Sequence, residues 1–319
     1  MSSKKREIEH FVAPLEETPL QAVDSTISDT APASLWTDAW HSLRKKPLFL
    51  ISAFLILLIA LVSLFPQLFS PLDPTSFTAC DLSHSLEGPS AGHILGYNKQ
   101  GCDIYSRVIY GTRASVSVGI LSTIGVVLLG GILGALAGFF GGWLDSIIAR
   151  LGDIFFALPL ILGALVVAQL PYFQENPGIL SVVFILVAFG WPNIARITRG
   201  AIIEVKHADF ITASTSLGVS RFGSLIKHAI PNALAPIIVV ATISLGTFIV
   251  AEATLSFLSI GLPGSMMSWG KDISDAQSLL RTNPEVLIYP AVALSVTVLS
   301  FIMLGDAVKD ALDPKARKQ

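Results

Sequence analysis

The stretch DFITASTSLGVSRFGSLIKHAIPNALAP, residues 209–236, is the longest amphiphilic interruption between two strongly apolar runs of the chain. Its pattern predicts two short helices around a turn. Gly218 is placed to end the first helix, 210–217, because glycine accepts the left-handed conformation that ends helices. Ser220 is placed to cap the second helix, and Pro231 suits the first turn of a new helix that follows it. We interpret the stretch as a helix–turn–helix on the membrane surface between two spans, where a soluble partner can push or pull it.

The composition limits the class of protein. Of the 319 residues, 52% are hydrophobic and only 14% are charged, and the mean hydropathy is +0.67. A soluble domain carries about 25% charged residues, so an ordinary soluble enzyme is excluded. The net charge of −2 provides no basic field, and we therefore expect no nucleic-acid partner.

Six apolar runs are long enough to cross a bilayer, which takes about 20 residues. Glycine and proline interrupt several of them, as is normal where helices pack closely or bend. The pattern predicts an all-α integral membrane protein with six transmembrane helices. The runs lie at about 48–69, 110–139, 147–170, 178–197, 232–260 and 285–305.

The N-terminal part differs from the rest. Residues 1–34 are polar and show no hydrophobic period, so we expect a disordered cytoplasmic tail. Trp36, Trp40 and Leu43 follow at helical spacing and predict an amphipathic helix at the membrane interface. The expected organisation has three parts. They are the tail 1–34, then 35–107 with the interfacial helix, the first span and an extracellular loop, and then 108–319, a five-helix core with a cytoplasmic loop at 201–231.

The distribution of lysine and arginine predicts the orientation. With the N-terminus inside, only five of the 21 basic residues fall on the outer side. This bias predicts that both termini, and the loop 209–231, are cytoplasmic. The five outer residues are Lys99, Arg107, Arg113, Lys271 and Arg281.

Both cysteines, Cys80 and Cys102, lie in the external loop 71–107. A noncytoplasmic compartment permits disulfides, so we predict a Cys80–Cys102 bond. The alternative is two unpaired thiols.

The stretch at 209–231 resembles the cytoplasmic loop of ABC-importer permeases, which reads Glu-Ala-Ala, three residues, Gly, and a run ending in Pro. Ala213, Gly218 and Pro231 stand at the matching offsets, whereas Thr212 replaces the glutamate and Ser214 the second alanine. In the family this loop is the coupling helix that docks on the ATPase subunit.

Four further segments resemble the second permease subunit of the dipeptide, oligopeptide and nickel branch of this family. In that branch an arginine commonly stands where this chain has Cys102. The resemblance covers nearly all of the chain from about residue 95 onward. The segments are LGYNKQGCDIYSRVIYGTR (95–113), AGFFGGWLDSIIARLGDIFFALP (137–159), AEATLSFLSIGLPGSMMSWG (251–270) and LGDAVKDALDPKARK (304–318).

The resemblance implies a type I ABC importer fold and transport by alternating access. The partners it implies are a second, similar permease, two ATPase domains and an external solute-binding protein, with ATP and Mg²⁺ bound by the ATPases. The chain has no Gly-rich phosphate loop followed by Lys-Ser/Thr, so we expect no cofactor, no metal and no catalytic residue here. The implied location is a bacterial cell membrane, crossed several times.

The expected ATPase-docking residues are those nearest the turn. Small residues allow close approach, and Leu217, Val219 and Phe222 offer apolar anchors. The full set is Ala213, Ser214, Leu217, Gly218, Val219, Ser220, Arg221 and Phe222.

Charged residues near the spans have alternative interpretations. Arg150 and Asp153 are three residues apart and favour a structural ion pair on one helix face over a gate or proton relay. Glu252 lies deep in the fifth span, where an acid is costly unless it faces protein or water. It therefore either faces the translocation path or bonds to a neighbouring helix, and these alternatives stay open.

Peptides are the favoured substrate, and nickel or another small solute is the alternative. A proton-coupled secondary transporter using Asp153 and Glu252 is a rival hypothesis. It predicts internal repeats with broken helices, of which the sequence shows no convincing sign. A membrane scaffold without transport activity is the second rival.

Overall fold

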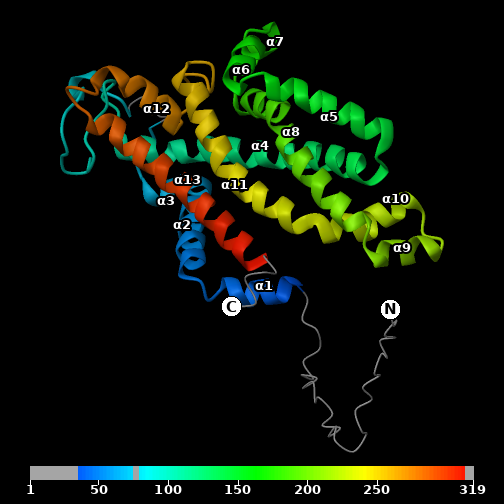
Figure 1. Ribbon diagram of the computed structural model, residues 1–319. Coiled ribbons are helices and arrows are strands. Elements are labelled where there is room, and N and C mark those ends of the chain that lie inside the picture. The colour runs from blue at the N-terminus through cyan, green and yellow to red at the C-terminus, as the bar shows by residue number, and fades with distance from the viewer. Residues whose placement is uncertain (1–34, 75–78, 313–319) are drawn as a thin grey trace, which may run out of the picture.

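The computed structural model describes residues 35–74 and 79–312, and within these ranges all regular elements are helices. Figure 1 shows long helices packed side by side, with the shorter helices near their ends. The predicted disordered tail, 1–34, lies outside the described residues.

Five helical stretches are long and apolar enough to cross a membrane. A sixth span is present if the bent pair α5 (Gly142–Ala157) and α6 (Leu160–Ala168) counts as one. The prediction of a helical protein with six apolar spans is confirmed in this sense. The five are α2 (Pro47–Leu64), α4 (Ile104–Phe140), α8 (Ile179–Lys206), the stretch Arg221–Phe257 that contains α11 (Ile230–Phe257), and α13 (Glu285–Leu312).

The run predicted as one span at 147–170 is broken. α5 and α6 meet at an angle of 87°. The cause is Pro159, because a proline disfavours the helical conformation in the residue before it. Leu158 accordingly adopts extended dihedral angles, φ −95° and ψ 119°.

The helix expected to end before Pro231 instead continues into the next span. α10 (Arg221–Ser224) passes through the π-helical segment η2 (Leu225–Ala229) into α11. The N–H of Ile230 donates to the carbonyl of Leu225, five residues back, so the turn widens without breaking. Pro231 stands in the first turn of α11, where its missing N–H costs nothing.

The shorter helices lie at the ends of the long ones. α1 (Leu35–Leu43) packs on the last turns of α13, where Ala39 and Leu43 are buried against Ala307 and Ala311. This contact ties the first helix of the described chain to the last. The others are α3 (Pro66–Phe69), η1 (Leu82–His84), α7 (Pro171–Glu175), α9 (Asp209–Ser216), α12 (Trp269–Ala276) and η3 (Gln277–Leu279).

The closest helix pair is α4 with α8. Gly130, Gly134 and Gly138 lie one turn apart on α4 and face the backbone of α8. Glycine at four-residue spacing allows two helix backbones to approach closely in a membrane. α8 is therefore held along α4, and α9 follows it at its C-terminal end.

Candidate functional site

The loop between α8 and α11 forms the candidate docking site. Figure 1 shows α9 and α10 at one end of the bundle, far from α12 and the cysteine-bearing segment at the other end. The loop therefore stands apart from the part of the chain expected outside the membrane.

The turn between α9 and α10 has the geometry that the sequence predicts. Gly218 has a φ of +85°. Its N–H donates to the carbonyl of Thr215 at 3.1 Å, and the N–H of Val219 donates to the carbonyl of Ser214 at 3.2 Å. This is a Schellman motif, which needs a left-handed residue at the glycine. The Ser220 hydroxyl accepts the Gly223 N–H at 3.1 Å and caps α10.

The inner face of the loop is packed against the long helices. Ile211 and Leu225 are buried beside Phe139 of α4 and Ile202 of α8. These contacts make the loop a rigid extension of the bundle, so a force applied to the loop moves α8 and α11 with it.

The outer face of the loop is strongly exposed. Leu217 is 86% exposed and Phe222 is 59% exposed. Both apolar side chains flank the turn between α9 and α10 and are free of contacts that would cover them. Of the other predicted docking residues, Ala213, Gly218, Ser220 and Arg221 are exposed, and Val219 is half-buried.

Ser214 departs from the predicted set. It is 7% exposed, and its hydroxyl lies 3.2 Å from that of Ser224. It faces inward because it is three residues after the buried Ile211, on the same side of α9. Phe210 is exposed but was missed by the sequence interpretation. Its spacing of seven residues from Leu217 places both on one helix face and was the available signal.

Arg221, at the start of α10, is exposed on the outer side of the loop. Arg221 makes no ion pair in the part of the chain that the structure describes. Its guanidinium is therefore open to an acidic group on a partner.

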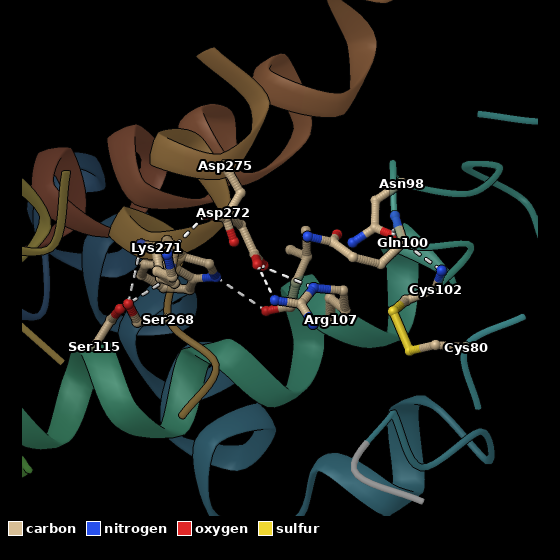
Figure 2. A network of polar contacts seen from close by, with 12 residues as sticks. Cys80, Asn98, Gln100, Cys102, Arg107, Ser115, Ser268, Lys271, Asp272 and Asp275 are labelled. Carbon is tan, nitrogen blue, oxygen red and sulfur yellow. Dashed lines mark hydrogen bonds and ion pairs between the residues drawn. A yellow bond between two sulfur atoms is a disulfide. The ribbon is translucent and has the colours of Figure 1, made fainter. Parts of the chain in front are cut away.

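The end of the bundle opposite the loop carries a network of polar contacts (Figure 2). The predicted Cys80–Cys102 disulfide is present. One residue beyond it, Asp103 accepts the Ser106 N–H at 2.7 Å and caps α4. The disulfide thus fixes the external segment to the start of α4.

α12 is attached to the same end of α4. The Arg107 Nε donates to Asp272 Oδ1 at 3.0 Å, and the Trp269 Nε1 donates to the Val108 carbonyl at 2.9 Å. Burial raises the pKa of the Asp272 carboxyl, and the neighbouring Arg107 guanidinium acts in the opposite direction. The external segment, α4 and α12 therefore form one connected unit (Figure 2).

Glu252 on α11 has no exposed surface. Its carboxylate accepts the hydroxyl protons of Ser115 on α4 at 3.0 Å and of Ser256 at 2.8 Å. The structure thus has the interhelix hydrogen bond that was one of the two alternatives for Glu252. In the same way, Arg150 lies 3.8 Å from Asp153, as expected for a pair at this spacing.

No group of three or more His, Cys, Asp or Glu side chains in the described ranges is arranged to hold a metal ion.

Comparison with known proteins gives consistent matches. Residues 130–318 match the family "Binding-protein-dependent transport system inner membrane component". Residues 34–89 match "N-terminal TM domain of oligopeptide transport permease C".

Curated relatives match over almost the whole chain. The dipeptide transport system permease protein DppC of Alkalihalophilus pseudofirmus is 34% identical over 284 residues, which is 89% of this chain and 91% of the relative. The oligopeptide transport system permease protein OppC of Bacillus subtilis is 35% identical over 286 residues, with the same coverage of 89% and 91%. The glutathione transport system permease protein GsiD of Pectobacterium atrosepticum is 34% identical, with coverage of 91% and 95%.

Among solved structures, a chain of the MetNI methionine ABC transporter in an inward-facing conformation matches with a TM-score of 0.53. The match covers 65% of this chain and 96% of that chain, at 20% identity. At this identity the likeness concerns the fold, which is that of a type I importer permease.

Proposed function

The chain belongs to the family of binding-protein-dependent transport system inner membrane components, and on this premise we propose that it imports dipeptides or oligopeptides. It is the membrane-spanning permease subunit of an ATP-driven importer and supplies half of the pathway. It carries out no chemistry itself.

The observation that carries the proposal is the rigid loop with its exposed apolar tip. Leu217 and Phe222 expose apolar surface that a monomeric membrane domain has no reason to maintain in water. The buried inner face, with Ile211 and Leu225, connects that tip to three long helices. An ATPase seated on the tip can therefore move the helices that surround the pathway.

The remaining partners follow from the same premise. A second permease of similar fold completes the pathway, two ATPase domains bind ATP and Mg²⁺, and an external binding protein delivers the peptide. Both termini and the loop 209–231 lie in the cytoplasm, in agreement with the distribution of lysine and arginine. The Cys80–Cys102 disulfide supports an outer location for the segment that contains it.

The substrate class is the finer part of the proposal. Relatives named for dipeptide, oligopeptide and glutathione transport favour a peptide. Nickel or another small solute is the alternative, carried by the same mechanism. A proton-coupled transporter is disfavoured, because the chain matches the binding-protein-dependent family and relatives named as permease proteins of peptide transport systems.

Co-purification from detergent-solubilised membranes tests the proposal. The wild-type chain is expected to recover a second permease and an ATPase. Leu217→Asp is expected to lose the ATPase and keep the second permease, because a charge at the tip prevents apolar docking. Leu82→Asp is the matched control, since Leu82 is also strongly exposed, at the opposite end of the molecule. A chain that purifies alone, or a Leu217→Asp variant that retains the ATPase, contradicts the proposal.

A further inference from the structure

One side of the bundle carries polar side chains at a depth where lipid does not accept them. α8 has 28 residues, about 42 Å at 1.5 Å per residue, and Asn193 lies roughly 21 Å from its outer end. Asn193, Arg196 and Gly200 recur along one exposed face of the inner half of this helix. Polar residues at such depth face protein or water.

α5 extends this polar face. The Arg196 Nη2 lies 3.8 Å from Asp153 Oδ1, and Arg150 lies 3.8 Å from the other oxygen of the same carboxylate. The Arg196 guanidinium also lies 4.2 Å above the centre of the Phe156 ring. The side chains of Arg150, Asp153 and Arg196 are all more than half exposed. Their ion pairs within the chain therefore leave charged atoms that need water or another partner.

A hollow of about 200 Å³ lies beneath these side chains, between α4, α5 and α8. Arg199, on its wall, donates from Nη2 to Asp145 at 2.6 Å. The surface thus presents guanidinium and carboxylate groups side by side, next to a cavity.

The chain is also broken between α5 and α6. Leu158 and Pro159 interrupt the helix and are both exposed. Non-helical backbone at membrane depth is tolerated only where protein covers it or a water-filled cavity borders it. The break follows Asp153 by five residues, and Leu158 continues the exposed apolar row of Ile147, Leu151 and Ile154 on α5.

α2 provides the contrast. It contains no charged residue, and its exposed side chains are apolar. Leu57, in the middle of this helix, is 60% exposed. This is the surface expected against lipid. Figure 1 shows α5 and α2 on different sides of the bundle.

From these observations we propose that the face of Asn193, Arg196 and Gly200, with Asp153, borders the aqueous pathway for the transported solute. The inference rests on the proposed function. The mixed charge suits a zwitterionic solute such as a peptide, since its amino and carboxylate groups find partners on the same surface. α5 and α8 therefore form this chain's share of the inner half of the path.

Single-cysteine variants test the assignment. The two native cysteines are paired in the disulfide, so the chain has no free thiol of its own. Asn193→Cys and Gly200→Cys place a thiol on the proposed face. A Cβ at Gly200 meets no atom within 4 Å, so that substitution does not disturb packing. Leu57→Cys is the lipid-facing control.

The complete importer in lipid nanodiscs is treated with a charged, membrane-impermeant methanethiosulfonate, and labelling of this chain is followed by mass. The thiols at positions 193 and 200 are expected to react at least about tenfold faster than the one at position 57, because the reagent does not enter hydrocarbon. A saturating peptide is expected to slow the reaction at position 193. Labelling also blocks uptake.

Two results overturn the inference. Labelling at positions 193 and 200 as slow as at position 57 means that the face is packed against the second permease or lipid. Rapid labelling that neither responds to peptide nor affects uptake means that water reaches the face but the solute does not. In both cases ATP-driven uptake by the wild-type complex leaves the proposed function standing. A wild-type complex that shows no ATP-driven uptake would contradict the proposed function instead.

Discussion

Substitution of Gly134 is expected to separate the two most closely packed helices. A Cβ built on Gly134 lies 2.3 Å from the Ala195 carbonyl oxygen and 2.9 Å from the Thr198 Cβ. The first contact is to backbone of α8, which cannot rotate away. Gly131, three residues earlier on the same helix, has nothing within 4 Å of its Cβ position.

The two alanine variants are therefore expected to change the free energy of unfolding in different ways. Gly134→Ala overpacks the α4–α8 interface, at a cost of about 1–3 kcal/mol in the free energy of unfolding. Gly131→Ala only replaces a flexible residue within a helix and is expected to be neutral or to stabilise by about 0.5–1 kcal/mol. Because both changes add one methyl group to α4, the difference isolates the contact with α8.

The assay is unfolding of the purified chain by titration with sodium dodecyl sulfate in mixed micelles, followed by loss of helical circular dichroism. Gly134→Ala is expected to unfold at a lower detergent fraction than the wild type, and Gly131→Ala at the same fraction or a higher one. Equal midpoints for the two variants would refute the close approach of α4 and α8.

Three further predictions concern other parts of the chain. Gly218→Pro is expected to distort the turn below Leu217, because proline fixes φ near −65° where the structure has +85°, and to uncouple ATP hydrolysis from uptake at normal membrane levels. Unchanged uptake would argue against the docking role. Cys80→Ser opens the loop that the disulfide closes and is expected to destabilise the segment around it by about 3 kcal/mol. The expected result is faster proteolysis near Cys102, and treatment of the wild type with reductant is expected to have the same effect. Resistance equal to the wild type would contradict it. Glu252→Ala is expected to destabilise the chain by about 1–3 kcal/mol, since two buried hydroxyl groups lose their acceptor, whereas Glu252→Gln keeps an acceptor and costs less. Equal loss in both variants would show that charge, not hydrogen bonding, is what matters there.

Local chemistry was predictable from the sequence. Gly218 and Ser220 occupy the positions that end one helix and cap the next, and the structure places them so. The Cys80–Cys102 bond followed from the compartment alone. The turn and the cap depend on residues that are close in sequence, and the disulfide depends on the side of the membrane on which its loop lies.

Relations between helices were not predictable. Ser214 is buried because Ser224 comes to lie beside it, which depends on how α9 and α10 pack. The two alternatives for Glu252 stayed open because Ser115 lies on another helix, 137 residues away. Such pairings depend on packing that no local pattern encodes.

Broken and continuous helices were also hard to distinguish. The run 147–170 is mostly apolar, with its charged residues Arg150 and Asp153 near its start, so its hydropathy gave no sign that the break at Leu158–Pro159 would turn the chain by 87°. Conversely, Pro231 suggested a new helix where a π-helical turn preserves the old one. A proline alone marks a site of altered backbone bonding, and the surrounding packing decides between a bend and a widened turn.

The decisive measurement is uptake of a labelled dipeptide into proteoliposomes that contain the complete importer, with ATP inside and the binding protein outside. Uptake is expected to require internal ATP, to be insensitive to a protonophore, and to fall to background with Leu217→Asp in this chain. Uptake by this chain alone, driven by a proton gradient without ATP, would contradict the assignment as an ABC-importer permease.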